Sequence, residues 1–122
     1  MYISLLTNIK NASAAKKPSL KFRFSKMDYS VAQILASHGF LKKVDMKGRG
    51  AKKVIDMELY DDAVHGMRMV STPSLRRFSG YRDFKKVKGG NGILIVSTPQ
   101  GIMTGDRARR EKHGGQLLFE IW

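Results

Sequence analysis

The apolar positions in the first half of the chain switch between helical and extended spacing. Residues 2–15 carry apolar side chains three or four positions apart, which predicts an amphipathic helix that Pro18 should end. Residues 20–24 alternate apolar and basic side chains, a pattern typical of a strand with one buried face. A second helix is predicted between Ser25, which suits an N-cap, and Gly39, which suits a helix stop.

Two more strands are predicted at about 40–46 and 52–60, joined by a flexible turn at 48–50. Alternate residues of the second strand are apolar, so one of its faces should be buried. Two consecutive aspartates at 61–62 begin a polar stretch. We expect residues 1–62 to form an N-terminal lobe with the order α-β-α-β-β.

The second half is richer in extended segments. Short strands are predicted at 66–71 and 75–78, whereas residues 79–88 are basic and poorly periodic. Residues 93–96 form a continuous apolar run, typical of a strand that is buried on both faces.

A polar loop is expected at 97–101, followed by a short basic helix that Thr104 can cap and that Gly114 and Gly115 should stop. A last strand is predicted at 117–122, with alternating inward and outward side chains. Residues 63–122 should therefore form a β-rich lobe with one short helix, which makes the fold class α+β with two small lobes.

Charge changes the picture from a generic small fold to a binding protein. The 122 residues are 42% hydrophobic, enough for a core, yet 23 Lys and Arg face 10 Asp and Glu for a net charge of +13. The excess covers both halves: residues 1–62 hold 12 basic against 6 acidic groups, and residues 63–122 hold 11 against 4. Such a chain favours a polyanionic partner; nucleic acid is the first reading and an anionic membrane surface the alternative.

The residues that usually carry chemistry are sparse. The absence of cysteine excludes disulfides, thiolate metal sites and Cys nucleophiles, and His38, His65 and His113 lack metal-ligand spacing. No phosphate-cradling glycine motif or nucleophile elbow occurs. We expect no catalytic residue, metal site or cofactor, and hence no enzyme. No apolar run reaches the roughly 18 residues of a membrane span, and residues 1–17 fit a retained helix better than a cleaved signal.

The loop at 97–101 is the strongest candidate for binding. It would present small hydroxyls from the end of a rigid strand, and hydroxyls can both donate and accept hydrogen bonds. Such groups can meet the 2′-OH groups, phosphates and base edges of folded RNA, while the basic helix that follows supplies phosphate contacts. The alternative is an ordinary Ser/Thr turn beside a solvated basic helix.

Several segments resemble one known family. Residues 92–104, GILIVSTPQGIMT, resemble the C-terminal signature of the universal small-subunit ribosomal protein eight family, as do residues 106–109 after them. Residues 6–12, LTNIKNA, and 69–76, MVSTPSLR, are similar to two further motifs of that family. The likeness runs in order along nearly the whole chain.

The resemblance implies a two-lobed α+β fold and a structural role in the small ribosomal subunit. It implies direct binding to the central domain of small-subunit ribosomal RNA, which supports folding and assembly, beside other small-subunit ribosomal proteins. In some members the messenger RNA of their own operon is a further partner; no membrane partner is implied. The protein would reside in cytoplasmic ribosomes, or in those of an organelle matrix. A free basic RNA chaperone and a cationic secreted protein are the alternatives.

The resemblance assigns most RNA contacts to the C-terminal lobe. Ser97 and Thr98 should meet sugar edges and bases, and the basic residues should neutralise phosphates. The other expected RNA-binding residues are Pro99, Gln100, Gly101, Arg76, Arg77, Lys85, Lys86, Arg110, Gly114, Gly115, Gln116, Lys10 and Asn11. Gly114 and Gly115 should let the backbone approach the RNA.

Five residues depart from the family pattern. Asn8 and Lys10 replace the usual arginines of the first helix. Pro99 replaces a serine and so removes a hydroxyl and an N–H. Gln116 replaces a glutamate and so removes a charge, and Gly105 looks inserted before the short helix.

Overall fold

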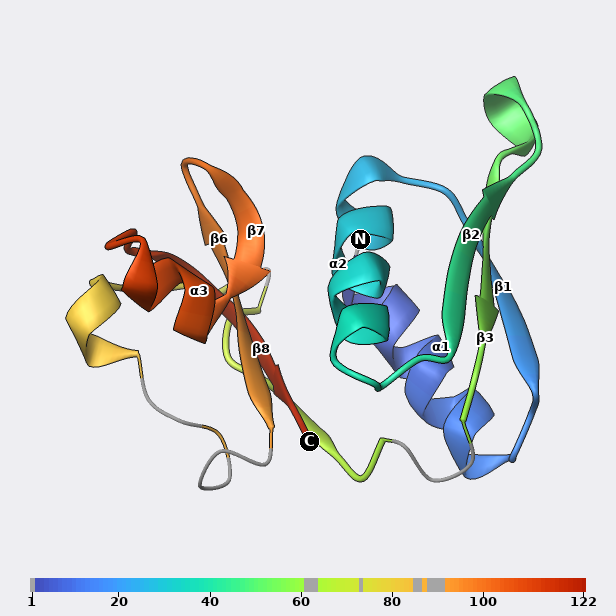
Figure 1. Cartoon of the computed structure of the whole chain (residues 1–122), viewed down its shortest axis with the longest axis horizontal. Helices are drawn as coiled ribbons and strands as arrows, with labels where there is room; N and C mark the ends of the chain where they lie inside the picture. The colour runs from blue at the N-terminus through green and yellow to red at the C-terminus, as the bar shows by residue number, and fades with distance from the viewer. Residues whose placement is uncertain (1, 61–63, 73, 85–86, 88–91) are drawn as a thin grey trace. The chain divides into compact units, whose positions relative to one another are not determined.

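The computed structural model describes residues 2–60, 64–72, 74–84, 87 and 92–122. It divides into two compact units, Met1–Val64 and His65–Trp122 (Figure 1). Both units contain antiparallel sheet and helix, so the predicted α+β class is confirmed.

Unit 1 has the predicted order of elements. Its elements are α1 (Tyr2–Ala14), β1 (Ser19–Arg23), α2 (Lys26–Ser37), β2 (Lys43–Lys47), the short 3₁₀ helix η1 (Gly50–Lys52) and β3 (Val54–Glu58). The strands form an antiparallel sheet in the order β1-β3-β2, and helix α1 contacts β1 while α2 contacts β2. Ile55 and Met57 of β3 are fully buried, as the alternation predicted, together with Leu5 and Leu6 of α1.

The ends of α2 follow local sequence signals, whereas a lysine in a left-handed conformation follows both α1 and α3. Ser25 caps α2, since its Oγ accepts a hydrogen bond from the backbone N–H of Asp28 at 3.1 Å. Gly39 ends α2 with φ +81°, as predicted. Helix α1 ends at Ala14, and Lys16 follows it with φ +55°, so the chain leaves the helix before Pro18. Lys112 has the same left-handed conformation after α3, with φ +60°. Backbone hydrogen bonds that return to the last turn hold both lysines in a conformation that favours glycine.

Unit 2 is built on a five-stranded antiparallel sheet. Its elements are β4 (Met67–Met69), β5 (Arg77–Ser79), the 3₁₀ helix η2 (Tyr81–Asp83), β6 (Ile93–Thr98), β7 (Gly101–Thr104), α3 (Gly105–Arg110) and β8 (Gly115–Ile121). The strand order is β4-β8-β6-β7, and β5 pairs with the beginning of β8. Strands β6 and β7 form a hairpin that leads directly into α3 (Figure 1).

Two predictions for unit 2 are wrong in detail. The expected loop at 97–101 is a hairpin: Ser97 and Thr98 belong to β6, and Gly101 begins β7. Only Pro99 and Gln100 form the turn. The polar residues and Gly101 had indicated a loop, so strand β7 was not predicted. Helix α3 is capped by Thr104, as predicted, but ends at Arg110 rather than continuing to Gly114.

A bulge in β8 changes the alternation of the last strand. Ile95 pairs with Phe119 but Val96 pairs with Leu117, so Leu118 has no partner residue on β6. Leu118 is buried, although simple alternation grouped it with outward-facing residues. Its carbonyl accepts hydrogen bonds from the N–H groups of Val70 and Ser71. The bulge therefore ties the segment after β4 to β8.

One buried cluster of unit 2 lies between the sheet and α3. Leu94 and Val96 of β6 form a buried cluster with Met103 and with Ala108 of α3. A Cβ at Gly105 would lie 3.2 Å from the Leu94 side chain, so this residue lets α3 approach the sheet closely. Because side chains alternate along a strand, Ile95 and Ser97 of β6 lie on the opposite face of the sheet.

Candidate nucleic-acid interface

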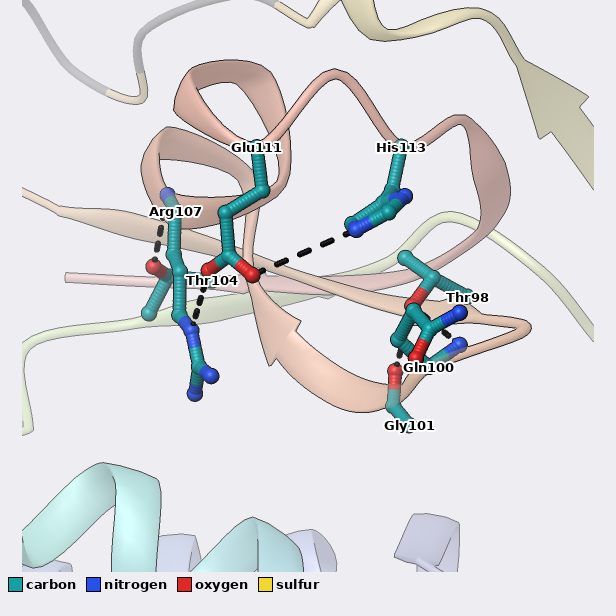
Figure 2. Close-up of polar contacts among 7 residues, drawn as sticks. All are labelled: Thr98, Gln100, Gly101, Thr104, Arg107, Glu111 and His113. Atoms are coloured by element: carbon teal, nitrogen blue, oxygen red, sulfur yellow. Dashed lines mark hydrogen bonds and ion pairs between the residues drawn. The ribbon is translucent and has the colours of Figure 1, made fainter.

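The β6–β7 turn is ordered by the hydroxyl of Thr98. The hydroxyl oxygen accepts a hydrogen bond from the N–H of Gln100 at 3.1 Å, and the hydroxyl donates to the carbonyl of Gly101 at 2.9 Å (Figure 2). Thr98 is buried, whereas Pro99 and Gln100 are exposed. Pro99 suits the first central position of such a turn because its φ is fixed near −65°. The Thr98 hydroxyl thus donates its hydrogen bond within the turn. The sequence had suggested that this hydroxyl contacts a ligand directly.

Ser97 belongs to a line of side chains that crosses four strands. It pairs with Ile102 of β7 and with Gln116 of β8, and Gln116 pairs in turn with Phe78 of β5. Directly paired residues of antiparallel strands project from the same face of a sheet. We call these four residues, Ile102, Ser97, Gln116 and Phe78, the Ser97 row. At about 4.8 Å between strands, the row spans about 14 Å.

The Ser97 row is accessible and chemically mixed. Ile102, Ser97 and Gln116 are partly exposed, and Phe78 is 70% exposed. Within the described part of the chain, neither the Ser97 hydroxyl nor the Gln116 amide has a side-chain hydrogen-bond partner. Both groups can donate and accept. The row therefore offers hydrogen-bonding groups in its middle and apolar surface at both ends.

Gly114 and Gly115 have an internal reason to be glycine. A Cβ at Gly115 would collide with the carbonyl of Ser97, and a Cβ at Gly114 would lie 2.9 Å from the carbonyl oxygen of Ser79. These two residues let β8 begin between β5 and β6. Their packing accounts for both glycines without the close approach of a ligand that the sequence suggested.

Arg77 and Ser97 lie on opposite faces of the sheet. Arg77 pairs with Leu117, which pairs with Val96, and the Val96 side chain is buried towards α3. The Arg77 side chain lines a hollow with Asp83 and others. The structure therefore does not bring Arg77 to the Ser97 row, although the two residues were expected to act together.

The basic residues of α3 differ in whether they form an ion pair within the protein. Arg107 donates to Glu111 at 2.6 Å, and this hydrogen bond holds the pKa of the Glu111 carboxyl below its ordinary value (Figure 2). Arg109 and Arg110 are exposed, and neither has an ion-pair partner among the residues that the structure describes. Arg109 and Arg110 are thus better placed than Arg107 to bind an external anion.

Two residues that sequence reasoning missed shape this part of unit 2. Ser71 is only 1% exposed; its Oγ accepts from the N–H of Arg77 at 2.9 Å and donates to the carbonyl of Leu117. Ser71 therefore fixes the start of β5 and the adjacent exposed Arg76. Phe78 was predicted only as part of a strand. An aromatic residue directly after two arginines was the available signal for a nucleic-acid contact.

The other expected residues fall elsewhere. Lys85 and Lys86 lie outside the described residues, and Lys10 and Asn11 lie on exposed positions of α1 in unit 1. The described residues contain no group of three or more His, Asp or Glu that could hold a metal ion. Within the same residues, every helix is too short or too polar to cross a membrane.

Comparisons of the sequence relate the chain to one family of known proteins. The family model of ribosomal protein S8 matches residues 3–122. The small ribosomal subunit protein uS8 of Rippkaea orientalis is 40% identical over 97% of this chain and 93% of the relative. The proteins of the same name from Caldicellulosiruptor bescii and Borrelia turicatae are 36% and 34% identical, with the same coverage of both chains.

Proposed function

Because the chain belongs to the ribosomal protein S8 family and is a structural, non-enzymatic component of the small ribosomal subunit that binds ribosomal RNA, we propose that it binds that RNA through the Ser97 row of unit 2. The observation that carries this proposal is the pair of adjacent strand residues Ser97 and Gln116, whose side-chain polar groups are accessible and form no hydrogen bond with the residues that the structure describes. Polar groups held on paired strands lose little entropy on binding.

The chemistry of the row suits the sugar edge of folded RNA. A 2′-OH both donates and accepts hydrogen bonds, as do the hydroxyl of Ser97 and the amide of Gln116. Because Gln116 is neutral, it can approach a phosphate without the repulsion that a glutamate would meet. The turn ordered by Thr98 and the glycine at 115 hold the two strands at this spacing.

Exposed arginines elsewhere in unit 2 support the same function. Arg76 is exposed in the turn before β5, and Arg109 and Arg110 are exposed on α3. Contacts from such residues to phosphates position the protein without reading sequence. The net charge of +13 supplies long-range attraction to the RNA.

The proposal is tested by titrating a central-domain fragment of small-subunit ribosomal RNA with the variant Ser97→Ala, Gln116→Ala. Loss of two hydrogen bonds at about 0.5–1.5 kcal/mol each should weaken binding about 5- to 150-fold. Ser74→Ala, an exposed serine of the same unit that lies outside the row, is the control. Unchanged affinity of the folded double variant would show that the row is not the binding surface.

A second test addresses the charges. Each phosphate contact contributes about 0.9 to the slope of log K against log salt, so Arg109→Gln with Arg110→Gln should flatten the slope by up to about 2. Lys43→Gln, a lysine of unit 1 that pairs with Asp45 at 3.3 Å, is the control. An unaltered slope in the double variant would exclude these arginines as phosphate contacts.

We also propose, from the family resemblance, that the same surface binds the messenger RNA of its own operon. A surface that reads the shape of an RNA stem would accept a messenger hairpin of the same shape. Competition between the ribosomal fragment and the operon transcript tests this: displacement by the transcript supports it, and a transcript that displaces no more than bulk RNA refutes it.

A further inference from the structure

The most exposed large apolar side chain of the described residues stands at one end of the Ser97 row. Phe78 is 70% exposed, although burial of a phenylalanine side chain is strongly favourable. Leu75, in the preceding turn, is 55% exposed. The two side chains leave apolar surface uncovered in β5 and in the turn before it, and Phe78 pairs with Gln116 of the Ser97 row.

The exposure of Phe78 is a property of an ordered strand. Its backbone is paired with Gln116 of β8, and the hydroxyl of Ser71 holds the N–H of Arg77, the residue before it. The turn that precedes β5 is closed by backbone hydrogen bonds between Thr72 and Leu75 in both directions. The ring is therefore held out by the fold and needs no rearrangement to meet a partner.

The surroundings of Phe78 indicate which partner covers it. The core of a protein interface is depleted in charge, whereas this ring lies beside Gln116 and near the exposed Arg76, in a half of the chain that carries 11 basic and 4 acidic residues. An aromatic face with cationic and amide groups around it matches an unpaired nucleotide: the base stacks on the ring and the phosphate meets an arginine.

We propose that Phe78 stacks on one unpaired base of the bound RNA and that Gln116, on the neighbouring strand, hydrogen-bonds the edge of that base. This inference rests on the proposed function, because it assumes that the Ser97 row faces RNA. It adds that the bound RNA has a base turned out of its stack beside β5. Paired positions on antiparallel strands lie about 4.5–5.5 Å apart at their Cα atoms, which lets the two side chains reach one base.

The test compares Phe78→Ala, Phe78→Leu and Phe78→Trp in titrations of the central-domain RNA fragment. Stacking on one base corresponds to about a 5- to 150-fold loss of affinity for Phe78→Ala. Phe78→Trp should keep the affinity, and Phe78→Leu should lose most of it because it is apolar without an aromatic face. Met46→Ala in unit 1, where Met46 is 44% exposed, controls for the loss of exposed apolar surface.

An abasic scan of the RNA identifies the partner base. One abasic position should weaken binding of the unaltered protein strongly and weaken binding of Phe78→Ala much less, because only the Gln116 hydrogen bond to that base then remains to be lost. Full affinity of Phe78→Ala, or equal affinity of Phe78→Leu and the unaltered protein, would refute the proposal that Phe78 stacks on a base. Another ribosomal protein would then be the partner that covers the Phe78 side chain. If Phe78→Ala binds fully while Ser97→Ala, Gln116→Ala does not, the proposed function stands and only this inference fails.

Discussion

Replacing Ser71 with alanine should destabilise unit 2 through two specific hydrogen bonds. The side chain is almost completely buried, and its Oγ accepts from the N–H of Arg77 at 2.9 Å while donating to the carbonyl of Leu117. Alanine fills the same space but offers neither bond. The N–H at the start of β5 and the carbonyl of β8 would lose these partners in a site that water does not reach.

The expected magnitude follows from the number of bonds. A hydrogen bond contributes about 1 kcal/mol to the free energy of unfolding, so Ser71→Ala should cost about 2 kcal/mol. For a cooperative unit of about 60 residues, this corresponds to a fall in Tm of about 8–16 °C. Ser74→Ala is the matched control, because Ser74 is exposed and its Oγ lies 3.3 Å from that of Thr72.

The assay combines thermal unfolding with amide hydrogen exchange. In Ser71→Ala the amide of Arg77 should exchange faster, because it has lost its acceptor, while amides of unit 1 should keep their rates. A Tm equal to that of Ser74→Ala, with unchanged exchange at Arg77, would show that the hydroxyl does not hold β5 and would refute the argument. Below its Tm the variant should also bind RNA more weakly, since β5 carries Phe78.

Three further outcomes are expected. Gly115→Ala should lower the free energy of unfolding by about 1–3 kcal/mol, because the new Cβ collides with the β6 backbone, whereas Gly80→Ala, where a Cβ meets nothing within 4 Å, should leave Tm nearly unchanged. Lys16→Gly should raise the free energy of unfolding by about 1 kcal/mol in urea unfolding, since Lys16 follows α1 with φ +55°; a lower stability would contradict this. A hydrogen bond from Lys47 lowers the pKa of Asp56 below its usual 3.8, so the stabilisation is full above that value and is lost as pH falls through the lowered pKa. Asp56→Asn should therefore destabilise the protein at neutral pH, and this effect should shrink as pH falls through the lowered pKa; an effect that stays the same across the acid range would exclude this linkage.

Local signals were sufficient for most of unit 1 and for the class of partner. Periodicity located both helices and the strands, and the residues Ser25, Gly39 and Thr104 marked helix ends, because capping depends on neighbours within four or five positions. The charge of +13 and the family motifs pointed to RNA without any knowledge of the fold. These inferences needed only contacts between residues that are close in the chain.

The tertiary structure decided what the candidate site contains. Ser97, Gln116 and Phe78 come from three separate strands, and only the pairing register places them side by side. The same register sends Arg77 to the other face, and the bulge buries Leu118. Register depends on long-range pairing and on close packing such as that of glycine 115 against β6, which no local pattern encodes. The sequence determined the kind of surface, and strand pairing determined which side chains share it.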